Sequence, residues 1–227
     1  MQFLVDGGDY ALLKVNLQEE TLYAESGAIV LIDKSLKVKT TSYDGVLKGL
    51  LRKLLAGESI FLLQIEGTGE VWLAPPLPGE IEAVQLNNEC YIVQDYAYLA
   101  HTGNLKFFFV HNGLKSFLGT ELVWLKICGT GTFWVSGYGS LEWVEVTPNQ
   151  MLDPLHFVTF KETEFQLKSV TEGFKDSLFD GEVDFLDFKK PTKVLLQSRI
   201  IPPLAEVVTR YTPQKAVKNL LLKRRPF

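Results

Sequence analysis

Cysteine and histidine are scarce in this chain of 227 residues, which contains two cysteines and three histidines. Cys90 and Cys128 are too few for a disulfide framework and too far apart in the sequence for a CxxC redox pair or a zinc knuckle. We expect both to be buried or half-buried reduced thiols, since a free cysteine commonly behaves as a small hydrophobe. The histidines, His101, His111 and His156, lack the His-x-His spacing of a cupin-type metal site. The sequence therefore predicts no metal site.

Long apolar runs and recognisable leader sequences are also missing. No apolar run approaches the roughly 18 residues that a membrane-spanning helix needs. Residues 1–6 have neither the pattern of a signal peptide nor that of a transit peptide, and we expect them to form the first strand. The chain contains no GxSxG elbow, no P-loop and no GxGxxG between a strand and a helix. These absences favour a cytoplasmic protein that is not an enzyme and needs no cofactor.

Three acidic residues, Glu25, Asp95 and Asp153, begin similar segments of the chain. Paired carboxylates could perform acid–base chemistry, which is one interpretation of them. The other is that they are turn and strand-start acids, whose oxygens accept hydrogen bonds from nearby backbone N–H groups. We favour the second interpretation, because each acid holds the same place in its segment. No catalytic residue is predicted.

The chain is rich in apolar and aromatic residues. Hydrophobic residues make up 46% of it and aromatic residues 12%, with 15 Phe and 4 Trp. Large side chains in these numbers suit packing between β-sheets better than a thin helical bundle. A chain of this length buries about 70% of its unfolded surface, so its core needs no covalent staple. We therefore expect a globular, mainly β protein.

The phrase Gly-Thr-Gly occurs twice, at residues 67–69 and 129–131, each time between two runs of alternating apolar residues. Glycine reaches positive φ without steric cost, and the flanking residues are β-branched or aromatic. This pattern predicts two β-hairpins with the phrase at their tips. A third, degraded hairpin has Lys-Pro-Thr at residues 190–192. Further upstream, Glu19 and Glu20 interrupt an apolar run as a turn would.

The segments around these hairpins recur along the chain. We predict a single β-rich domain over residues 1–200, made of three related units at about 1–57, 58–120 and 121–200. Each unit begins with a strand that an acidic residue introduces and continues with a strand of alternating apolar and polar residues. A Gly-apolar-Lys turn and a hairpin complete the unit. Units of this length exceed the usual solenoid period, and tripled strand units more naturally close on themselves. Edge strands left open invite further pairing, so we expect a homo-oligomer.

In residues 46–55 the apolar residues change from strand-like alternation to helical spacing. Leucines lie on one face of the predicted helix, and Lys48, Arg52 and Lys53 lie on the other. A short basic amphipathic helix can lie on an anionic membrane or on a partner protein. It can equally connect two strands and close one end of the core with its leucines. The three basic residues are therefore candidate contacts with a partner or a membrane surface.

The composition changes again in residues 201–227, the C-terminal tail. From Leu204 onward six basic residues stand against one acidic residue, although the whole chain has a formal net charge of -4. Two short helices are predicted, at residues 204–211 and from Thr212. The tail can meet anionic lipid or RNA, or dock on the acidic body of its own chain or of a neighbouring subunit. Its candidate contact residues are Lys223, Arg224 and Arg225.

Six short motifs follow one another in a specific order, at residues 26–30, 57–61, 73–81, 94–100, 129–131 and 197–199. In this order they resemble the altered-inheritance-of-mitochondria protein twenty-four family, over residues 1 to about 211. The resemblance implies a fold like that of the tryptophan RNA-binding attenuator protein (TRAP), a β-rich arrangement of the double-stranded β-helix type. Mitochondrial members of the family are associated with inner-membrane organisation, and the family has no established catalytic residues to transfer.

The sequence departs from the family pattern at residues 153–156, at the third hairpin and in the basic tail. We predict a self-associating, non-enzymatic scaffold or interaction protein that meets a membrane surface. One alternative is a small-ligand-binding or enzymatic double-stranded β-helix protein. A second alternative is RNA binding through the tail, although a sequence pI near 5.5 argues against a broad nucleic-acid surface.

Overall fold

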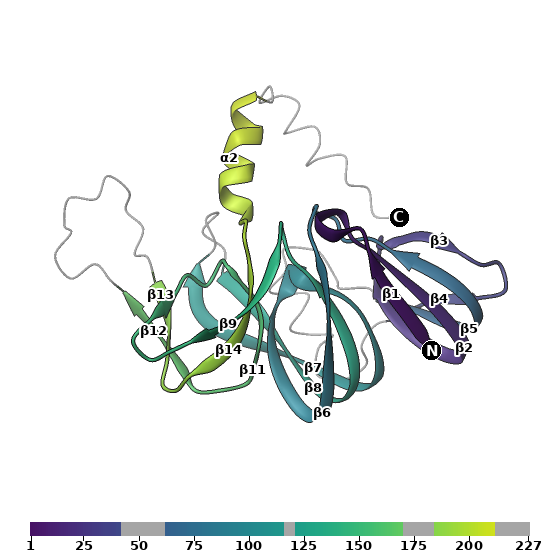
Figure 1. Ribbon diagram of the computed structural model, residues 1–227, viewed down its shortest axis with the longest axis horizontal. Coiled ribbons are helices and arrows are strands. Elements are labelled where there is room, and N and C mark those ends of the chain that lie inside the picture. The colour runs from purple at the N-terminus through teal and green to yellow at the C-terminus, as the bar shows by residue number, and fades with distance from the viewer. Residues whose placement is uncertain (42–61, 116–120, 170–183, 212–227) are drawn as a thin grey trace.

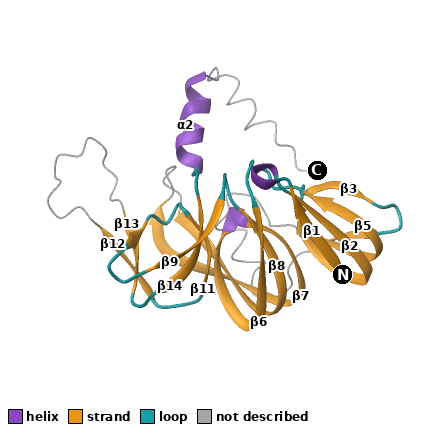
Figure 2. Ribbon diagram, viewed as in Figure 1, coloured by secondary structure: helices purple, strands orange, loops and turns teal. Residues whose placement is uncertain are grey.

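The computed structural model of the chain describes residues 1–41, 62–115, 121–169 and 184–211. Strands dominate these residues, and one α-helix stands clear of them (Figures 1 and 2). The strands are β1 (Gln2–Asp6), β2 (Leu12–Glu25), β3 (Ile29–Ile32), β4 (Lys37–Thr41), β5 (Leu62–Leu73), β6 (Ile81–Gln94), β7 (Tyr98–Lys115), β8 (Glu121–Ser136), β9 (Leu141–Val146), β10 (Met151–Leu152), β11 (Phe157–Lys161), β12 (Phe165–Ser169), β13 (Asp184–Phe188) and β14 (Thr192–Gln197). The helices are α2 (Ile201–Tyr211) and two single 3-10 turns, η1 (Gly8–Tyr10) and η2 (Asp95–Ala97).

The strands form two sheets in which the named pairs are antiparallel. The larger sheet has the order β3-β5-β2-β7-β8-β6-β11-β14-β9, with β1 paired to β2 and β4 to β5. The smaller sheet has the order β10-β13-β12. Strands β1 to β5 lie at one end of the molecule and β12 and β13 at the other, with β6 to β8 between them (Figure 1). The predicted fold class, mainly β with antiparallel strands, is confirmed.

The strands fall into three sets that pair in the same order. In chain order, set 1 consists of β2, β3 with β4, and β5; set 2 of β6, β7 and β8; and set 3 of β9 with β10, β11 with β12, and β13 with β14. In every set the third strand lies between the first and the second. Neighbouring sets join where the first strand of one pairs with the second strand of the next, as β2–β7 and β6–β11.

The two Gly-Thr-Gly phrases do not form hairpin tips, so this prediction was wrong. Strands β5 and β8 continue through the phrase, and one of the strands paired with each of them, β2 and β6 respectively, bulges opposite it. The predicted turn at Glu19 is likewise a bulge within the continuous strand β2. A bulge adds one residue to one strand and increases its twist, so the pair bends without ending. Alternation of apolar residues on both sides of a glycine is the same for a bend and for a hairpin tip.

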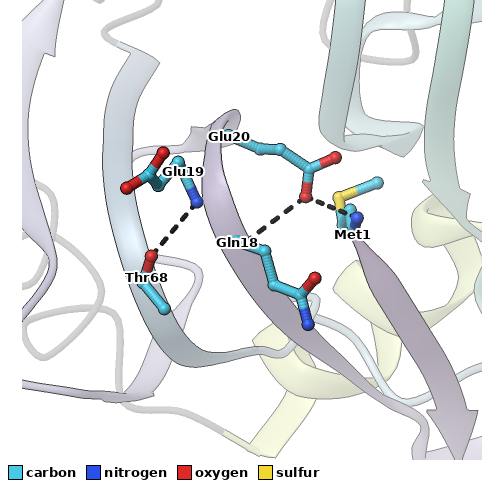
Figure 3. Close-up of polar contacts among 5 residues, drawn as sticks. All are labelled: Met1, Gln18, Glu19, Glu20 and Thr68. Atoms are coloured by element: carbon cyan, nitrogen blue, oxygen red, sulfur yellow. Dashed lines mark hydrogen bonds and ion pairs between the residues drawn. The ribbon is translucent and has the colours of Figure 1, made fainter.

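Each bulge places a non-glycine residue in the left-handed region, Glu19 with φ 59° and Asn88 with φ 56°. The backbone N–H of Glu19 donates a hydrogen bond to the Thr68 hydroxyl at 3.2 Å (Figure 3). Asn88 donates the same bond to Thr130, also at 3.2 Å. The threonine of each phrase thus satisfies the donor that the bulge removes from the ladder.

In set 3 the corresponding bend is a break. Strand β13 ends at Phe188 and β14 begins at Thr192, while β9 ends at Val146 and β10 begins at Met151. Pro191, within the break, has no N–H to donate to a ladder. The two halves of this pair consequently belong to different sheets.

Buried apolar side chains form three clusters along the molecule, and each cluster takes side chains from at least two neighbouring sets. The first cluster packs the interior of set 1 and also contains Leu99 and Ala100 of β7. The second packs the interior of set 2 and contains Val158 of β11. The third contains Ile92 and Trp124 of set 2 together with Phe157, Phe160 and Phe188 of set 3. The second strand of each later set therefore completes the core of the set before it.

Cys90 and Cys128 form a disulfide, so the expectation of two reduced thiols was wrong. They face each other in the register of the neighbouring strands β6 and β8, with their Cα atoms 4.1 Å apart. This is close to the roughly 4.5 Å of a non-hydrogen-bonded antiparallel pair, which brings two side chains within bonding reach. The pairing follows from the strand order, which the cysteine spacing does not reveal.

Several local predictions are confirmed. The first strand is β1, and the alternating segment near residues 36–40 is β4. The first helix of the tail is α2, which begins three residues earlier than predicted, at Ile201. The predicted helix at residues 46–55 and the one from Thr212 lie outside the described residues. Within the described chain, no helix combines the length and the apolar character that crossing a membrane requires.

Candidate functional site

The predicted contact residues lie outside the part of the chain that the structure describes. They fall in the segments 42–61 and 212–227 and are Lys48, Arg52, Lys53, Lys223, Arg224 and Arg225. Nothing in the described chain brings the two groups together or separates them. The prediction that they contact a partner or a membrane stays a prediction.

Among the described acidic residues, Asp153 confirms the interpretation of a turn acid. Its Oδ1 accepts a hydrogen bond from the backbone N–H of Leu155 at 2.8 Å. Glu25 ends β2, and its backbone oxygen accepts from the N–H of Ala28 at 3.2 Å in the turn to β3. Within residues 1–41, 62–115, 121–169 and 184–211, no group of three or more His, Cys, Asp or Glu side chains is arranged to hold a metal ion.

The first junction between sets joins β2 to β7 through a stack of aromatic rings. The ring of Tyr23 lies parallel to that of its strand partner His101, with centroids 4.7 Å apart. The Nδ1 atom of His101 lies 2.6 Å from the hydroxyl of Tyr98, and the ring of Phe107 is 5.0 Å away. His101 is almost completely buried, and this burial lowers its pKa to about 3. The imidazole is therefore neutral at physiological pH and serves as a packed ring of the junction.

A half-open hollow of about 380 Å³ lies beside this junction. The carboxylate of Glu20 at its rim pairs with the amino group of Met1 at 2.5 Å and accepts a hydrogen bond from the backbone N–H of Gln18 (Figure 3). The one carboxylate at the hollow is thus already paired. The lining residues are Met1, Glu20, Thr21, Tyr23, Thr102 and Gly103.

The second junction joins β6 to β11 and contains buried polar groups in place of aromatic stacking. The hydroxyl of Thr159 donates to the backbone oxygen of Ile92 at 2.9 Å, and both residues are buried. Nearby, the buried Gln94 donates through Nε2 to the backbone oxygen of Pro154 at 2.6 Å. The bonds tie the end of β6 to the turn that leads into β11.

Gln197, at the end of β14, adds a third connection to this region. Its Oε1 accepts from the N–H of Tyr138 at 3.0 Å, while its Nε2 donates to the Tyr96 hydroxyl at 2.7 Å and to the Leu155 oxygen at 2.9 Å. Both junctions are thus closed by buried side chains that have partners on the neighbouring set.

Two strands that correspond to the joined ones have no such neighbour. We call Ile29–Ile32 the β3 edge and Met151–Leu152 the β10 edge. β3 is the last strand of the larger sheet and β10 the last strand of the smaller sheet, so each has one side with no strand partner among the described residues. Apolar side chains are exposed on both edges: Val30 is 55% exposed, Leu31 43% and Met151 48%. We take these two edges as the candidate functional site.

The sequence predicted that open edges exist but not where they are. The bulges have a sequence signal, since a pair of polar residues, Glu19 with Glu20 and Asn87 with Asn88, interrupts each apolar alternation. Asparagine in particular tolerates the left-handed region. The edges themselves become visible only when the strand order is known, because the continuous apolar run of β3 is no different from that of a buried strand.

Comparisons with known proteins agree with one another. A family model described as "Mitochondrial biogenesis AIM24" matches residues 3–199. An uncharacterised protein of Streptococcus pyogenes serotype M6 is 26% identical over 228 residues, which cover 94% of this chain and 92% of that protein. A crystal structure of a Streptococcus pyogenes protein superimposes with a TM-score of 0.73 at 25% identity, over 93% of this chain and 99% of that one.

Proposed function

This chain belongs to the AIM24 family, whose model is described as "Mitochondrial biogenesis AIM24". We propose that the chain is a β-rich scaffold or interaction protein, is not an enzyme, and associates with further copies of itself. The observation that carries the proposal is the exposure of apolar side chains on the β3 edge and the β10 edge. Exposed, unpaired strand edges are templates for pairing with another chain. An apolar edge adds the free energy of removing its side chains from water.

The repeated order of strand pairing supports a chain built from three related units. A head-to-tail series of like units has a free half-junction at each end. In this chain the two free halves are the β3 edge and the β10 edge. Such a series extends or closes through contacts between copies, as heterologous interfaces do.

The cytoplasmic location predicted from the sequence belongs to this proposal. The Cys90–Cys128 bond argues against this location, because disulfides persist mainly in oxidising compartments and are rare in the cytosol. Contact with a membrane surface through the basic residues of segments 42–61 and 212–227 also stays a prediction, as do ligand binding and RNA binding.

Light scattering after size-exclusion chromatography tests the proposal. The chain has a mass of 25.6 kDa, and we expect a species of at least twice that mass whose proportion rises with protein concentration. Association through apolar edges should persist at 0.5 M salt, whereas association through the basic tail should weaken. A protein that stays monomeric over a concentration range of about 100-fold would contradict self-association.

A further inference from the structure

The chain forms one type of junction twice within itself. In both, the end of a first strand pairs antiparallel with the beginning of the second strand of the next set. The paired residues are Tyr23 with His101 and Ala24 with Ala100 at the first junction, and Ile92 with Phe160 and Val93 with Thr159 at the second. The two junctions therefore use one register.

The β3 edge has the backbone pattern of the strands that enter these junctions. Strands β3, β7 and β11 each skip one residue in their pairing with the third strand of their set. The skipped residues are Val30, Leu99 and Val158. Counted from this irregularity, Leu31 and Ile32 hold the two places that pair across a junction in the other sets.

The β10 edge holds the complementary place. Met151 and Leu152 are the last two residues of the first strand in set 3, and Met151 pairs with Asp187 of β13. The separation along the chain from Asp187 to Val194 equals the separation from Gln64 to Val71. Gln64 is the strand partner of Tyr23. Since Val71 and Val194 pair with Ile32 and Phe160, the counts start from equivalent points. Met151 thus corresponds to Tyr23 and Leu152 to Ala24.

Burial distinguishes the joined strands from the free ones. Leu99 and Val158, at the skipped position, are fully buried because each enters the core cluster of the preceding set. Val30, at the same position, is 55% exposed. Leu31 is 43% exposed, whereas its counterparts Ala100 and Thr159 are fully buried. The β3 edge thus carries the side chains of a junction strand without the set that would cover them.

We propose that the β3 edge of one copy adds to the β10 edge of a second copy in the register of the internal junctions, which pairs Leu31 with Leu152 and Ile32 with Met151. Val30 then enters the third core cluster, to which Leu152 belongs, as Leu99 enters the first. This inference rests on the proposed self-association and specifies its interface. The contact is heterologous, so copies join head to tail into a ring or an open series.

A cross-linking experiment tests the register. Chains that carry Ile32→Cys are mixed with differently tagged chains that carry Met151→Cys, and the mixture is oxidised mildly, with the cross-linked peptides identified by mass spectrometry. We expect a disulfide between the two tags, because facing residues of antiparallel strands have Cβ atoms about 5 Å apart. The control replaces Ile32→Cys by Val38→Cys and should give at most a tenth of the cross-linked product.

Val38 is a matched control because it is apolar, lies on an open strand of set 1, is as exposed as Leu31, at 43%, and is more exposed than the half-buried Ile32 that it replaces in the cross-linking. It lies on β4, which pairs with β5. The residues of β7 that correspond to Val38 face the equivalent part of β8, and in the described chain they pair with β8 alone. The proposed junction therefore does not reach it.

A second pair of variants tests the interface without cysteines. Leu31→Lys places a charge in the proposed strand pair and should raise the dissociation constant of the assembly at least tenfold. Val38→Lys should change it less than twofold. Circular dichroism and melting temperature confirm that both variants fold.

The outcomes separate the two proposals. A multimer that cross-links through Val38→Cys as readily as through Ile32→Cys, or that Leu31→Lys leaves intact, overturns the β3–β10 interface while self-association stands. A chain that is monomeric in light scattering overturns both. Preferential Ile32–Met151 cross-linking together with dissociation by Leu31→Lys supports both.

Discussion

The hydroxyl of Thr68 accepts a hydrogen bond from the backbone N–H of Glu19, the residue that bulges from the strand opposite it. Thr130 and Asn88 repeat this relationship in set 2. Each Gly-Thr-Gly phrase is therefore one half of a bend whose other half is the bulge. The threonine binds the bulge, and the glycines allow the backbone angles that the bend requires, with φ 123° at Gly67.

The two bends differ in how much room their first glycine has, which predicts unequal effects of alanine. A Cβ on Gly129 would lie 2.2 Å from the backbone oxygen of Asn104, because β7 runs unbroken past the bend. A Cβ on Gly67 would have its nearest neighbour, Leu36 Cδ2, at 3.6 Å, because β3 and β4 are interrupted there. Gly67→Ala should cost about 1 to 3 kcal/mol of unfolding free energy through left-handed strain, and Gly129→Ala should cost more.

Urea unfolding followed by tryptophan fluorescence measures both values. Since the two glycines share a positive φ, the Gly67 variant serves as the control for strain without a backbone clash. Equal losses for the two variants would contradict the steric account.

The Cys90–Cys128 bond predicts resistance to thiol labelling and a contribution to stability. Its loop spans 38 residues, and for this length the chain-entropy model gives about 3 to 4 kcal/mol. We expect a maleimide to label no thiol in the unfolded, unreduced chain and two after reduction. Reduction should lower the urea midpoint of the natural protein and leave that of the Cys90→Ser, Cys128→Ser double variant unchanged. Two labelled thiols before reduction would contradict the disulfide.

His101 predicts a loss of stability in acid. Its pKa is lowered by burial from 6.5 to about 3, so between these values the unfolded chain binds a proton that the folded chain excludes. The contribution of His101 is therefore complete above pH 6.5 and is lost as the pH falls toward about 3, at up to about 1.4 kcal/mol per pH unit.

His101→Phe should remove this part of the pH dependence of unfolding while keeping a ring next to Tyr23. Tyr98→Phe is the matched control: it removes the hydroxyl 2.6 Å from Nδ1 but retains the imidazole, so the acid slope should remain. An imidazole that titrates near pH 6.5 in the folded protein by NMR would contradict the prediction.

Gln197 should be more costly to replace than Gln94. Gln197→Leu leaves the N–H of Tyr138 without its acceptor and removes two further bonds, for a loss of about 2 to 4 kcal/mol. Gln94→Leu removes one bond, to Pro154, and the Oε1 of Gln94 has no hydrogen-bond partner among the described residues. Thermal unfolding of both variants measures the difference, and a larger loss for Gln94→Leu would exclude the connecting role of Gln197.

Local patterns predicted the strands but not how they bend and meet. Alternation of apolar residues located β1, β4 and the long flanks of both Gly-Thr-Gly phrases, because the side-chain period of a strand is local. It could not separate a hairpin tip from a bend, since the difference lies in the strand opposite. The bond between Cys90 and Cys128 was missed for the same reason.

The candidate site was out of reach of the sequence for a related reason. The basic side chains that were predicted to contact a partner or a membrane lie in segments outside the described chain, whereas the exposed edges consist of ordinary strand residues. Among the described residues, Val30 differs from Leu99 and Val158 in having no neighbouring set, and a missing neighbour leaves no mark in the local sequence.

The break at residues 189–191 separates the smaller sheet from the continuous ladder of the larger one. We expect this short sheet, which no strand ladder among the described residues joins to the larger one, to open at a lower free energy than the larger sheet, as a local unfolding unit. The β10 edge belongs to this sheet. A second copy bound there would bind only the closed form, so association and the protection of these amides from hydrogen exchange would be linked by mass action.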